Sequence, residues 1–256
     1  MRIGSWNVNS LKARLSHVID WLTAQKPDVL LLQELKGTEF PVDTFKAIGY
    51  DSEYVAQKTY NGVATLSRHP ITVLSRNLLG DETDNHARYL EVDIQDLRII
   101  NIYLPNGNPV GTDRFVYKLA WMDRLKRRLA ALNNKKISTV VGGDFNVIPE
   151  NIDCFSPNYW KKDALFQPEP RERFRQLIKL GYIDAFRHFC KEPGHYTFWE
   201  YFLDHWKHNR GIRIDHFLVS ASLAKCMKEC WIDKGPRTCE TFRSRRSLIC
   251  GFIRET

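Results

Sequence analysis

The sequence lacks several features, and each absence excludes a class of protein. Its six cysteines contain no C-x-x-C pair. Within a segment that we expect to be helical, Cys226 and Cys230 lie four apart, with no histidine or second cysteine pair at zinc-binding spacing. No apolar run approaches the ~20 residues that span a bilayer. Met1 leads straight into the strand-like run of residues 2–8, so we expect no signal peptide. We therefore expect reduced thiols, no membrane partner and a cytoplasmic location.

The chain also has no internal repeat, low-complexity tract or linker. Its 256 residues suit one large α/β domain or two small ones, and the proportions of hydrophobic (43%) and charged (27%) residues are typical of globular proteins. The net charge of +8 and the pI of about 9.2 favour an anionic partner, of which nucleic acid is the commonest. We expect the protein to be a monomer.

Short apolar runs predict buried strands, and the amphipathic stretches between them predict helices. The predicted strands span residues 2–8, 28–32, 62–66, 90–94, 98–104, 139–142 and 213–219. One predicted helix has an apolar face formed by Leu11, Leu15, Val18, Ile19 and Leu22. A second has an apolar face formed by Val116, Leu119, Met122, Leu125, Leu129 and Leu132, with Lys and Arg opposite. Strands and helices alternate at first and strands pair later, which indicates a layered α/β sandwich in one domain.

Polar side chains close four of the predicted strands, in residues 5–9, 31–36, 102–107 and 141–146. An Asn or Asp after a strand is as often a turn former or helix cap as a functional group. Glu34 is harder to dismiss, because it follows a run of buried leucines and a carboxylate there needs a partner such as a hard divalent cation. Asp144 follows two glycines, which allow close backbone approach, and Asn146 shares its face if the chain stays extended.

Seven short motifs occur in a fixed order between residue 1 and about residue 220. They are W-N-V-N, L-Q-E-L-K, Y-N-G-V-A, Y-L-P-N-G, G-D-F-N-V, Y-T-F-W and G-I-R-I-D. This ordered set resembles the exonuclease III branch of abasic-site endonucleases, within the endonuclease/exonuclease/phosphatase superfamily. The resemblance implies a four-layered α/β sandwich, in which two packed mixed β-sheets are flanked by helices as in deoxyribonuclease I.

The resemblance also implies a metal-dependent DNA repair nuclease. Such an enzyme hydrolyses the phosphodiester 5′ to abasic sites in double-stranded DNA and removes nucleotides or blocking groups from 3′ ends. Glu34 would hold Mg²⁺, or alternatively Mn²⁺, with Asn7 close by. The carboxylate of Asp144 and the amide of Asn146 would complete the metal-associated set.

Four side chains would carry out the chemistry, according to the same resemblance. Asp144 would orient or deprotonate the attacking water, and Asn146 would hydrogen-bond the phosphate in the transition state. Tyr103 would contact the phosphate or the leaving oxygen, and Asp215 would hold a catalytic histidine. Phosphodiester cleavage needs these functions in any case, because developing charge must be neutralised and a nucleophile held in line.

Basic and amide side chains at or near the matching strand ends are predicted to contact DNA through its backbone phosphates. They are Lys36, Lys58, Tyr60, Asn61, Arg88 and Asn106. An aromatic cluster contains Phe198, Trp199, Tyr201 and Phe202. Core packing is one interpretation of this cluster; the other is a pocket wall, with Trp199 in contact with an extruded abasic sugar.

The family pattern is broken near the C-terminus. Relatives carry a Ser-Asp-His-Ala-Pro segment before the last strand, whereas residues 240–247 here are Glu-Thr-Phe-Arg-Ser-Arg-Arg-Ser. Without the histidine, Asp215 would lose the partner it orients. We do not expect His216 to substitute, because adjacent strand residues point to opposite faces. Arg243 or Arg245 would serve only as a fixed cation, since guanidinium stays protonated.

A frameshift near residue 240, from mutation or sequencing error, would explain this departure. Codons can be chosen for Glu-Thr-Phe-Arg-Ser-Arg such that the frame one base later encodes Lys-Pro-Ser-Asp-His-Ala. Chance compatibility is the alternative. We therefore expect a single catalytic domain over residues 1–256, atypical from about residue 240. Two other hypotheses stay open: a protein that binds abasic DNA with little turnover, and a superfamily phosphoesterase with another substrate.

Overall fold

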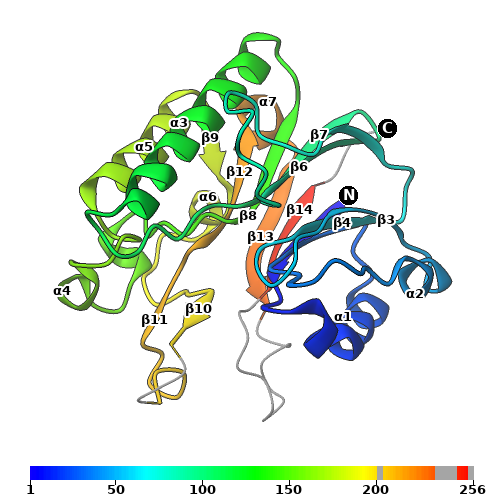
Figure 1. Ribbon diagram of the computed structural model, residues 1–256, viewed down its shortest axis with the longest axis horizontal. Helices are drawn as coiled ribbons and strands as arrows, with labels where there is room; N and C mark the ends of the chain where they lie inside the picture. Colours follow the sequence, from blue (N-terminus) through cyan, green and yellow to red (C-terminus); the bar gives the residue numbers. More distant parts are fainter. Residues whose placement is uncertain (201–203, 234–246, 253–256) are drawn as a thin grey trace.

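Two six-stranded β-sheets pack face to face, and helices cover the outer face of each (Figure 1). This computed structural model describes residues 1–200, 204–233 and 247–252, the last six as backbone only. The four layers are those expected from the motifs. Among the described residues, no helix is both long and apolar enough to cross a membrane.

The first sheet has the order β13-β14-β1-β2-β4-β3. Its strands are β1 (Arg2–Asn7), β2 (Val29–Gln33), β3 (Asp51–Val55), β4 (Val63–Ser67), β13 (Met227–Asp233) and β14 (Ser247–Phe252). Parallel pairing joins β1 and β2, and every other neighbouring pair is antiparallel. The carboxyl ends of β1 and β2 therefore lie together at one edge of the sheet.

The second sheet has the order β5-β6-β7-β8-β12-β9. Its strands are β5 (Thr72–Ser75), β6 (Tyr89–Ile94), β7 (Leu97–Tyr103), β8 (Thr139–Asp144), β9 (Tyr182–Asp184) and β12 (Asp215–Ser220). Here β7 and β8 are the parallel pair. A small separate hairpin is formed by β10 (Phe198–Trp199) and β11 (Gly211–Ile212).

Each sheet has its own helical cover (Figure 1). The first is covered by α1 (Leu11–Gln25) and α2 (Val42–Ala47), and the second by α3 (Asp113–Asn134) and α5 (Pro168–Lys179). Shorter helices are η1 (Asn151–Asp153), α4 (Pro157–Trp160), α6 (Ala185–Phe189) and α7 (Ala221–Ala224). The hydroxyl of Ser10 accepts from the backbone N–H of Ala13 and so caps α1.

The hydrophobic core follows these layers. One cluster between the sheets includes Leu31, Val92 and Phe217. Two further clusters join each sheet to its helices, one around Trp6 and the other around Trp121. Burial of each such side chain stabilises the fold by roughly 1.5–3 kcal/mol, so the two sheets are held firmly against each other.

A polar contact also crosses between the sheets. Nε2 of Gln33, at the end of β2, donates to Oδ1 of Asn101 in β7 at 2.8 Å. Nδ2 of Asn101 donates to the backbone carbonyls of Leu32 and Ala64. The three residues that these bonds join to the Asn101 side chain belong to the first sheet, so this buried amide helps to set how the sheets align near the ends of their parallel strands.

The predicted strands are all present, but two local predictions were wrong. Val116 is 64% exposed, and the buried face of α3 begins instead with Phe115 and continues through Lys118 to Met122. Cys230 lies in β13 and not in a helix. A β-bulge between Met227 and Glu229 lets two residues three apart, Met227 and Cys230, face the core, and this produces a spacing that resembles a helix.

Candidate active site

Chemically active side chains collect where the parallel strands of both sheets end. Asn7 is the last residue of β1, and Glu34 directly follows β2. Tyr103 and Asp144 are the last residues of β7 and β8. Asp215, the first residue of β12, pairs directly with Asp144 across the antiparallel ladder. The edge formed by carboxyl ends of parallel strands is where α/β folds usually build sites.

The amide of Asn7 joins residues from the two sheets. Its Nδ2 donates to Oε1 of Glu34 at 2.8 Å and to Oδ2 of Asp144 at 3.0 Å. Its Oδ1 accepts from the backbone N–H of Asn9 at 3.1 Å. Asn7 and Asp144 are fully buried. One amide therefore holds two carboxylates in a single cluster, although Asn7 and Asp144 are 137 positions apart.

Glu34 adopts a left-handed backbone conformation with φ +57°. For a residue with a side chain this costs roughly 1–2 kcal/mol. Neighbouring backbone bonds enforce it: Ser10 donates to the Glu34 carbonyl at 2.7 Å, and Lys36 donates to the Asn61 carbonyl at 3.0 Å. The strain aims the carboxylate at Asn7, and strained residues of this kind concentrate at functional sites.

Asp144 depends on the glycine before it. Gly143 has φ +140°, and a Cβ there would lie 2.0 Å from the carbonyl oxygen of Ile102 on the neighbouring strand. The loop beyond is held by Asn146, whose N–H donates to Oδ1 of Asp144 at 3.0 Å. Nδ2 of Asn146 donates to the Leu104 carbonyl at 2.8 Å and to Oδ2 of Asp144 at 3.3 Å.

Tyr103 is the strand neighbour of Asp144 on the side opposite Asp215. The guanidinium of Arg88 stacks over the Tyr103 ring at 4.8 Å, and its Nη1 donates to the Tyr103 carbonyl at 3.1 Å. On the two neighbouring strands, Asp144 thus lies between Tyr103, whose ring is stacked by Arg88, and the buried carboxylate of Asp215.

The donor set fits a hard divalent cation. Glu34 and Asp144 supply carboxylate oxygens, and the amide nitrogens of Asn7 and Asn146 donate to these carboxylates. In the part of the chain that the structure describes, no three His, Cys, Asp or Glu side chains form a closed metal cage. Two clustered carboxylates suit a divalent cation that binds through one or two carboxylates and keeps several waters.

Lys118 is a member of this site that the sequence interpretation missed. Its side chain is buried, and Nζ donates to the backbone carbonyls of Asn106 at 2.9 Å, Asn146 at 2.7 Å and Ala164 at 3.1 Å. Burial lowers the pKa of Lys118 to about 7, against the opposing effect of the Asp163 and Asp144 carboxylates. A signal was present, because Lys118 has helical spacing with the core residue Met122.

Seven of the predicted residues line one open cavity of about 730 Å³. They are Glu34, Lys36, Tyr60, Asn61, Arg88, Tyr103 and Asn106. Gln57 joins two of the lining segments, since its Oε1 accepts from Nδ2 of Asn61 at 2.7 Å and from the N–H of Ala87 at 3.1 Å. Lys58 is exposed in the adjoining loop. The prediction that these residues share one surface is consistent with this grouping, and their contact with DNA stays a prediction.

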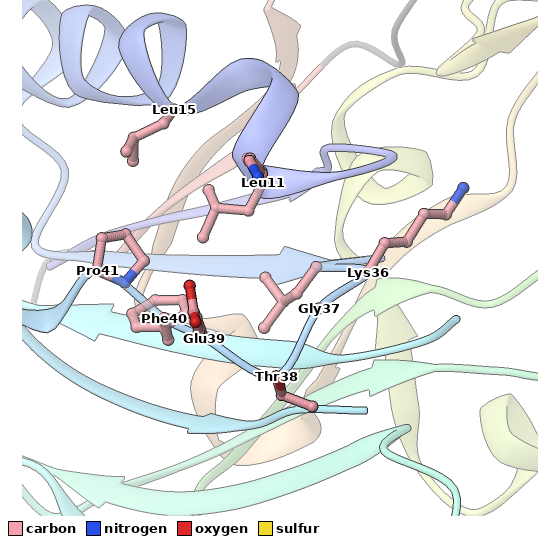
Figure 2. A pocket seen from close by; sticks show the side chains of 10 residues that line it. Leu11, Leu15, Lys36, Gly37, Thr38, Glu39, Phe40 and Pro41 are labelled. Atoms are coloured by element: carbon pink, nitrogen blue, oxygen red, sulfur yellow. The ribbon is translucent and has the colours of Figure 1, made fainter. Parts of the chain in front are cut away.

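Lys36 also belongs to a second cavity, of about 480 Å³. Figure 2 shows Leu11 and Leu15 of α1 on one side of it and Phe40 and Pro41 on the other. The ammonium of Lys36 points away from these apolar side chains, and it pairs with Oε2 of Glu34 at 2.9 Å. The stem of Lys36 therefore packs in one cavity while its charge lies in the other.

Trp199 is not among the residues that line the cavity of about 730 Å³ that contains Glu34, called the Glu34 cavity below. It is 1% exposed in the β10–β11 hairpin and packs edge-on against Trp206 at 4.8 Å. Phe198 is partly buried in a neighbouring core cluster, while Tyr201 and Phe202 lie outside the described residues. The core-packing interpretation of this aromatic cluster therefore matches the position of Trp199.

His216 faces away from Asp215, as expected. Its Nδ1 accepts from Nη1 of Arg213 at 2.7 Å, and its Nε2 donates to the Val147 carbonyl at 3.0 Å. Burial, and next the Arg213 cation, lower the pKa of His216 to about 4. The ring is therefore neutral, and both of its nitrogens are used in hydrogen bonds. Residues 240–246, with Arg243 and Arg245, lie outside the described residues.

The model of the Endonuclease/Exonuclease/phosphatase family matches residues 4–246. The chain belongs to this family. It is 33% identical to the DNA repair nuclease APEX1 of Danio rerio, over 87% of this chain and 74% of that protein. It is 30% identical to an exodeoxyribonuclease of Bacillus subtilis, over 90% and 92% of the two chains. Within the family, then, the chain groups with the exodeoxyribonucleases and abasic-site endonucleases, which confirms the resemblance of the motifs.

Solved structures agree with this placement. An AP endonuclease from Archaeoglobus fulgidus superposes with a TM-score of 0.94 at 32% identity, over 98% of this chain and 99% of that one. The 3′ phosphatase NExo from Neisseria, solved with a product DNA hairpin, gives 0.95 at 32% identity, over 99% of each chain. The four-layered fold of the family is confirmed.

Proposed function

We propose that this protein is a Mg²⁺-dependent DNA repair nuclease that hydrolyses the phosphodiester 5′ to abasic sites and trims nucleotides or blocking groups from 3′ ends. The Asn7 amide, which joins the carboxylates of Glu34 and Asp144 beside a cavity lined by basic side chains, carries the proposal. The named activities of the relatives, which include exonuclease, 3′ phosphatase and abasic-site endonuclease, support it.

Glu34 would hold the metal ion, with Asn7, Asp144 and Asn146 around it. The bound ion would neutralise the negative charge that develops on the phosphate. Mg²⁺ suits this oxygen-rich, open set, and Mn²⁺ is the alternative because it prefers the same ligand types.

The protein's own residues would orient the reactants. Asp144 would position the attacking water and accept its proton, with Asp215 and Tyr103 on either side of it. Asn146 would contact the phosphate by exchanging the longer of its Nδ2 bonds, the 3.3 Å bond to Asp144. Tyr103, stacked by Arg88, would contact the phosphate or the leaving oxygen.

A second candidate function is the binding of abasic DNA with little turnover. All eight histidines lie among the described residues, and His216, adjacent to Asp215, is committed to Arg213 and Val147. Loss of a histidine from a cooperative catalytic unit costs on the order of 10⁴ in rate by analogy with protease triads. Metal and DNA binding would survive, because Glu34 and Asp144 remain.

Two proteins test these proposals: the chain as given, and a chain with the shifted frame restored to Ser-Asp-His-Ala after residue 240. Both would be assayed for binding and nicking of an abasic duplex with Mg²⁺ and with chelator. The restored chain should nick, and binding without nicking would overturn the nuclease proposal. The given chain should be slower by orders of magnitude; near-equal rates would exclude the binding-only function.

Substrate class and assembly need their own measurements. Turnover of inositol phosphates in parallel with abasic DNA would distinguish a DNA repair enzyme from a phosphoesterase with another substrate.

We further propose that the protein is a cytoplasmic monomer. The free thiols of Cys154, Cys190 and Cys226 suit a reducing compartment, and light scattering after gel filtration would measure the mass.

A further inference from the structure

The cavity that contains Glu34 and Tyr103 also reaches a cluster of side chains that the proposed chemistry does not use. His86 and Tyr117 line it, and Asp84 lies directly behind them. Asp84 and His86 come from the loop before β6, whereas Tyr117 comes from the second turn of α3.

Asp84 is the centre of this cluster. Its side chain is 6% exposed and accepts hydrogen bonds from Tyr117 Oη at 2.9 and 3.0 Å, from His86 Nδ1 at 2.8 Å, and from Nη2 of Arg124. Burial raises the pKa of Asp84, but the hydrogen bonds from Arg124, His86 and Tyr117 outweigh burial and leave it below the ordinary value. The carboxylate is therefore ionised and can only accept hydrogen bonds.

This carboxylate fixes the orientation of the His86 ring. Because Asp84 only accepts, Nδ1 of His86 carries the proton of their 2.8 Å hydrogen bond. The ring also packs against the ring of Tyr117, with centroids 5.4 Å apart. His86 is nevertheless 48% exposed, and it lines the cavity. Its remaining nitrogen, Nε2, is the group available to a ligand.

Charge determines what that ligand is. A neutral ring would present the Nε2 lone pair, which repels anions, whereas a protonated ring presents Nε2–H, a donor that an anion can accept. Arg88 follows two residues later, and its backbone N–H donates to the His86 carbonyl at 2.8 Å. Arg114 lines the same cavity. Two guanidinium groups thus lie with His86 in one region, which suits an oxygen anion.

We infer that His86 binds a backbone phosphate of the DNA strand in this cavity, through Nε2–H, with Asp84 and Tyr117 as positioning residues. This inference rests on the proposed function, because that function makes DNA the occupant. Phosphate binding through a protonated ring weakens as the pH rises, since an imidazole loses its charge between about pH 5 and 8. The other charged or titratable groups that face this cluster are Asp81, Arg88, Asp113, Arg114 and Arg124.

Equilibrium binding tests the inference without any need for catalysis. Wild type, His86→Gln and Asp84→Asn would be titrated against a labelled abasic duplex, without Mg²⁺, at about pH 6 and about pH 8, the range over which imidazole titrates. His188→Gln is the matched control, because His188 is exposed in α6 and lines no part of the cavity. Melting temperatures would establish that each variant is folded.

His86→Gln should weaken binding roughly 3- to 10-fold at the lower pH and less than about 2-fold at the higher pH, and should make the log–log salt slope shallower by about 0.9 at the lower pH. Asp84→Asn should give the same pH-dependent loss, and His188→Gln should match wild type. If His86→Gln binds like wild type at both pH values, the inference is overturned and the proposed function stands. If wild type itself binds no duplex, the proposed function fails, and this inference with it.

Discussion

The ammonium group of Lys36 lies 2.9 Å from Oε2 of Glu34, on the carboxylate that we propose holds the metal ion. Both side chains are partly exposed, at 30% and 13%. Lys36 also donates to Oδ1 of Asn9, so its position is fixed from two sides. Lys36 and a bound metal ion would therefore compete for the Glu34 carboxylate.

Lys36→Met should therefore tighten metal binding and weaken DNA binding. For a partly exposed pair worth about 1 kcal/mol, metal affinity should rise about five-fold. Calorimetric titration with Mn²⁺ measures this directly. Lys12→Met is the matched control, because Lys12 is exposed and lines only the apolar cavity. Metal affinity that stays the same or falls would show that Lys36 does not compete.

Glu34→Ala should abolish Mg²⁺-dependent cleavage by the frame-restored protein and leave the fold intact. Alanine keeps a Cβ, so the left-handed backbone of residue 34 is no more strained than before. Nicking over a Mg²⁺ titration and the melting temperature would be measured together. Glu39→Ala, in the same loop but outside the Glu34 cavity, is the control. Unchanged cleavage at every Mg²⁺ concentration would remove Glu34 from the site.

Lys58→Ala should make the salt dependence of DNA binding shallower by about 0.9 in the log–log slope. Lys58 is exposed beside Tyr60, and a phosphate contact there carries no lesion information. Affinity for abasic and intact duplexes should thus fall equally. Fluorescence anisotropy at several salt concentrations gives both values. A slope identical to that of wild type would mean that Lys58 is a solvated charge away from the DNA.

Trp199→Ala should lower stability, because Trp199 is buried against Trp206. A buried Trp→Ala change costs roughly 3–5 kcal/mol, which corresponds to a fall in Tm of about 10 °C in a chain of this size. Scanning calorimetry would measure the shift, and the ratio of abasic to intact affinity would be measured on the folded variant. A lower preference for abasic DNA with an unchanged Tm would instead place Trp199 at the lesion.

His216 should make the protein acid-sensitive. Burial and the Arg213 cation lower its pKa from 6.5 to about 4 in the folded state. The unfolded chain therefore binds the extra proton first, and stability is lost as the pH falls from 6.5 towards 4, by on the order of 3 kcal/mol. His216→Gln should lose correspondingly less over this range. Parallel pH profiles in urea unfolding would contradict the prediction.

Much of the fold and part of the site could be predicted from local sequence. Polar residues that directly follow apolar strands, such as Glu34 and Asp144, are recognisable because strand and loop lie side by side in the chain. Their convergence is not local: the Asn7 amide joins them across 27 and 137 positions. Only the family resemblance anticipated that they would lie together.

Other features could not be predicted because they depend on tertiary packing. The helical spacing places Lys118 at a core position of α3, but burial of its charge depends on three converging carbonyls and on the Asp163 and Asp144 carboxylates, which come from distant segments. His86 was overlooked because the Asp84 carboxylate that orients its ring is itself held by Tyr117, 33 positions away from Asp84. The helix expected around Cys230 was wrong because a bulge in β13 changed the period of its buried residues.

The proposed metal ligands come from both sheets: Asn7 and Glu34 belong to one, and Asp144 belongs to the other. The distance between the ligands of the two sheets therefore depends on how the sheets pack against each other. A sub-ångström slip between the sheets would separate the ligands without breaking any strand. Apolar residues in the layer between the sheets, such as Leu31 and Phe217, therefore help to set the relative positions of the proposed metal ligands. Substitutions in this layer would therefore change the geometry of the proposed site without altering any residue that meets the substrate.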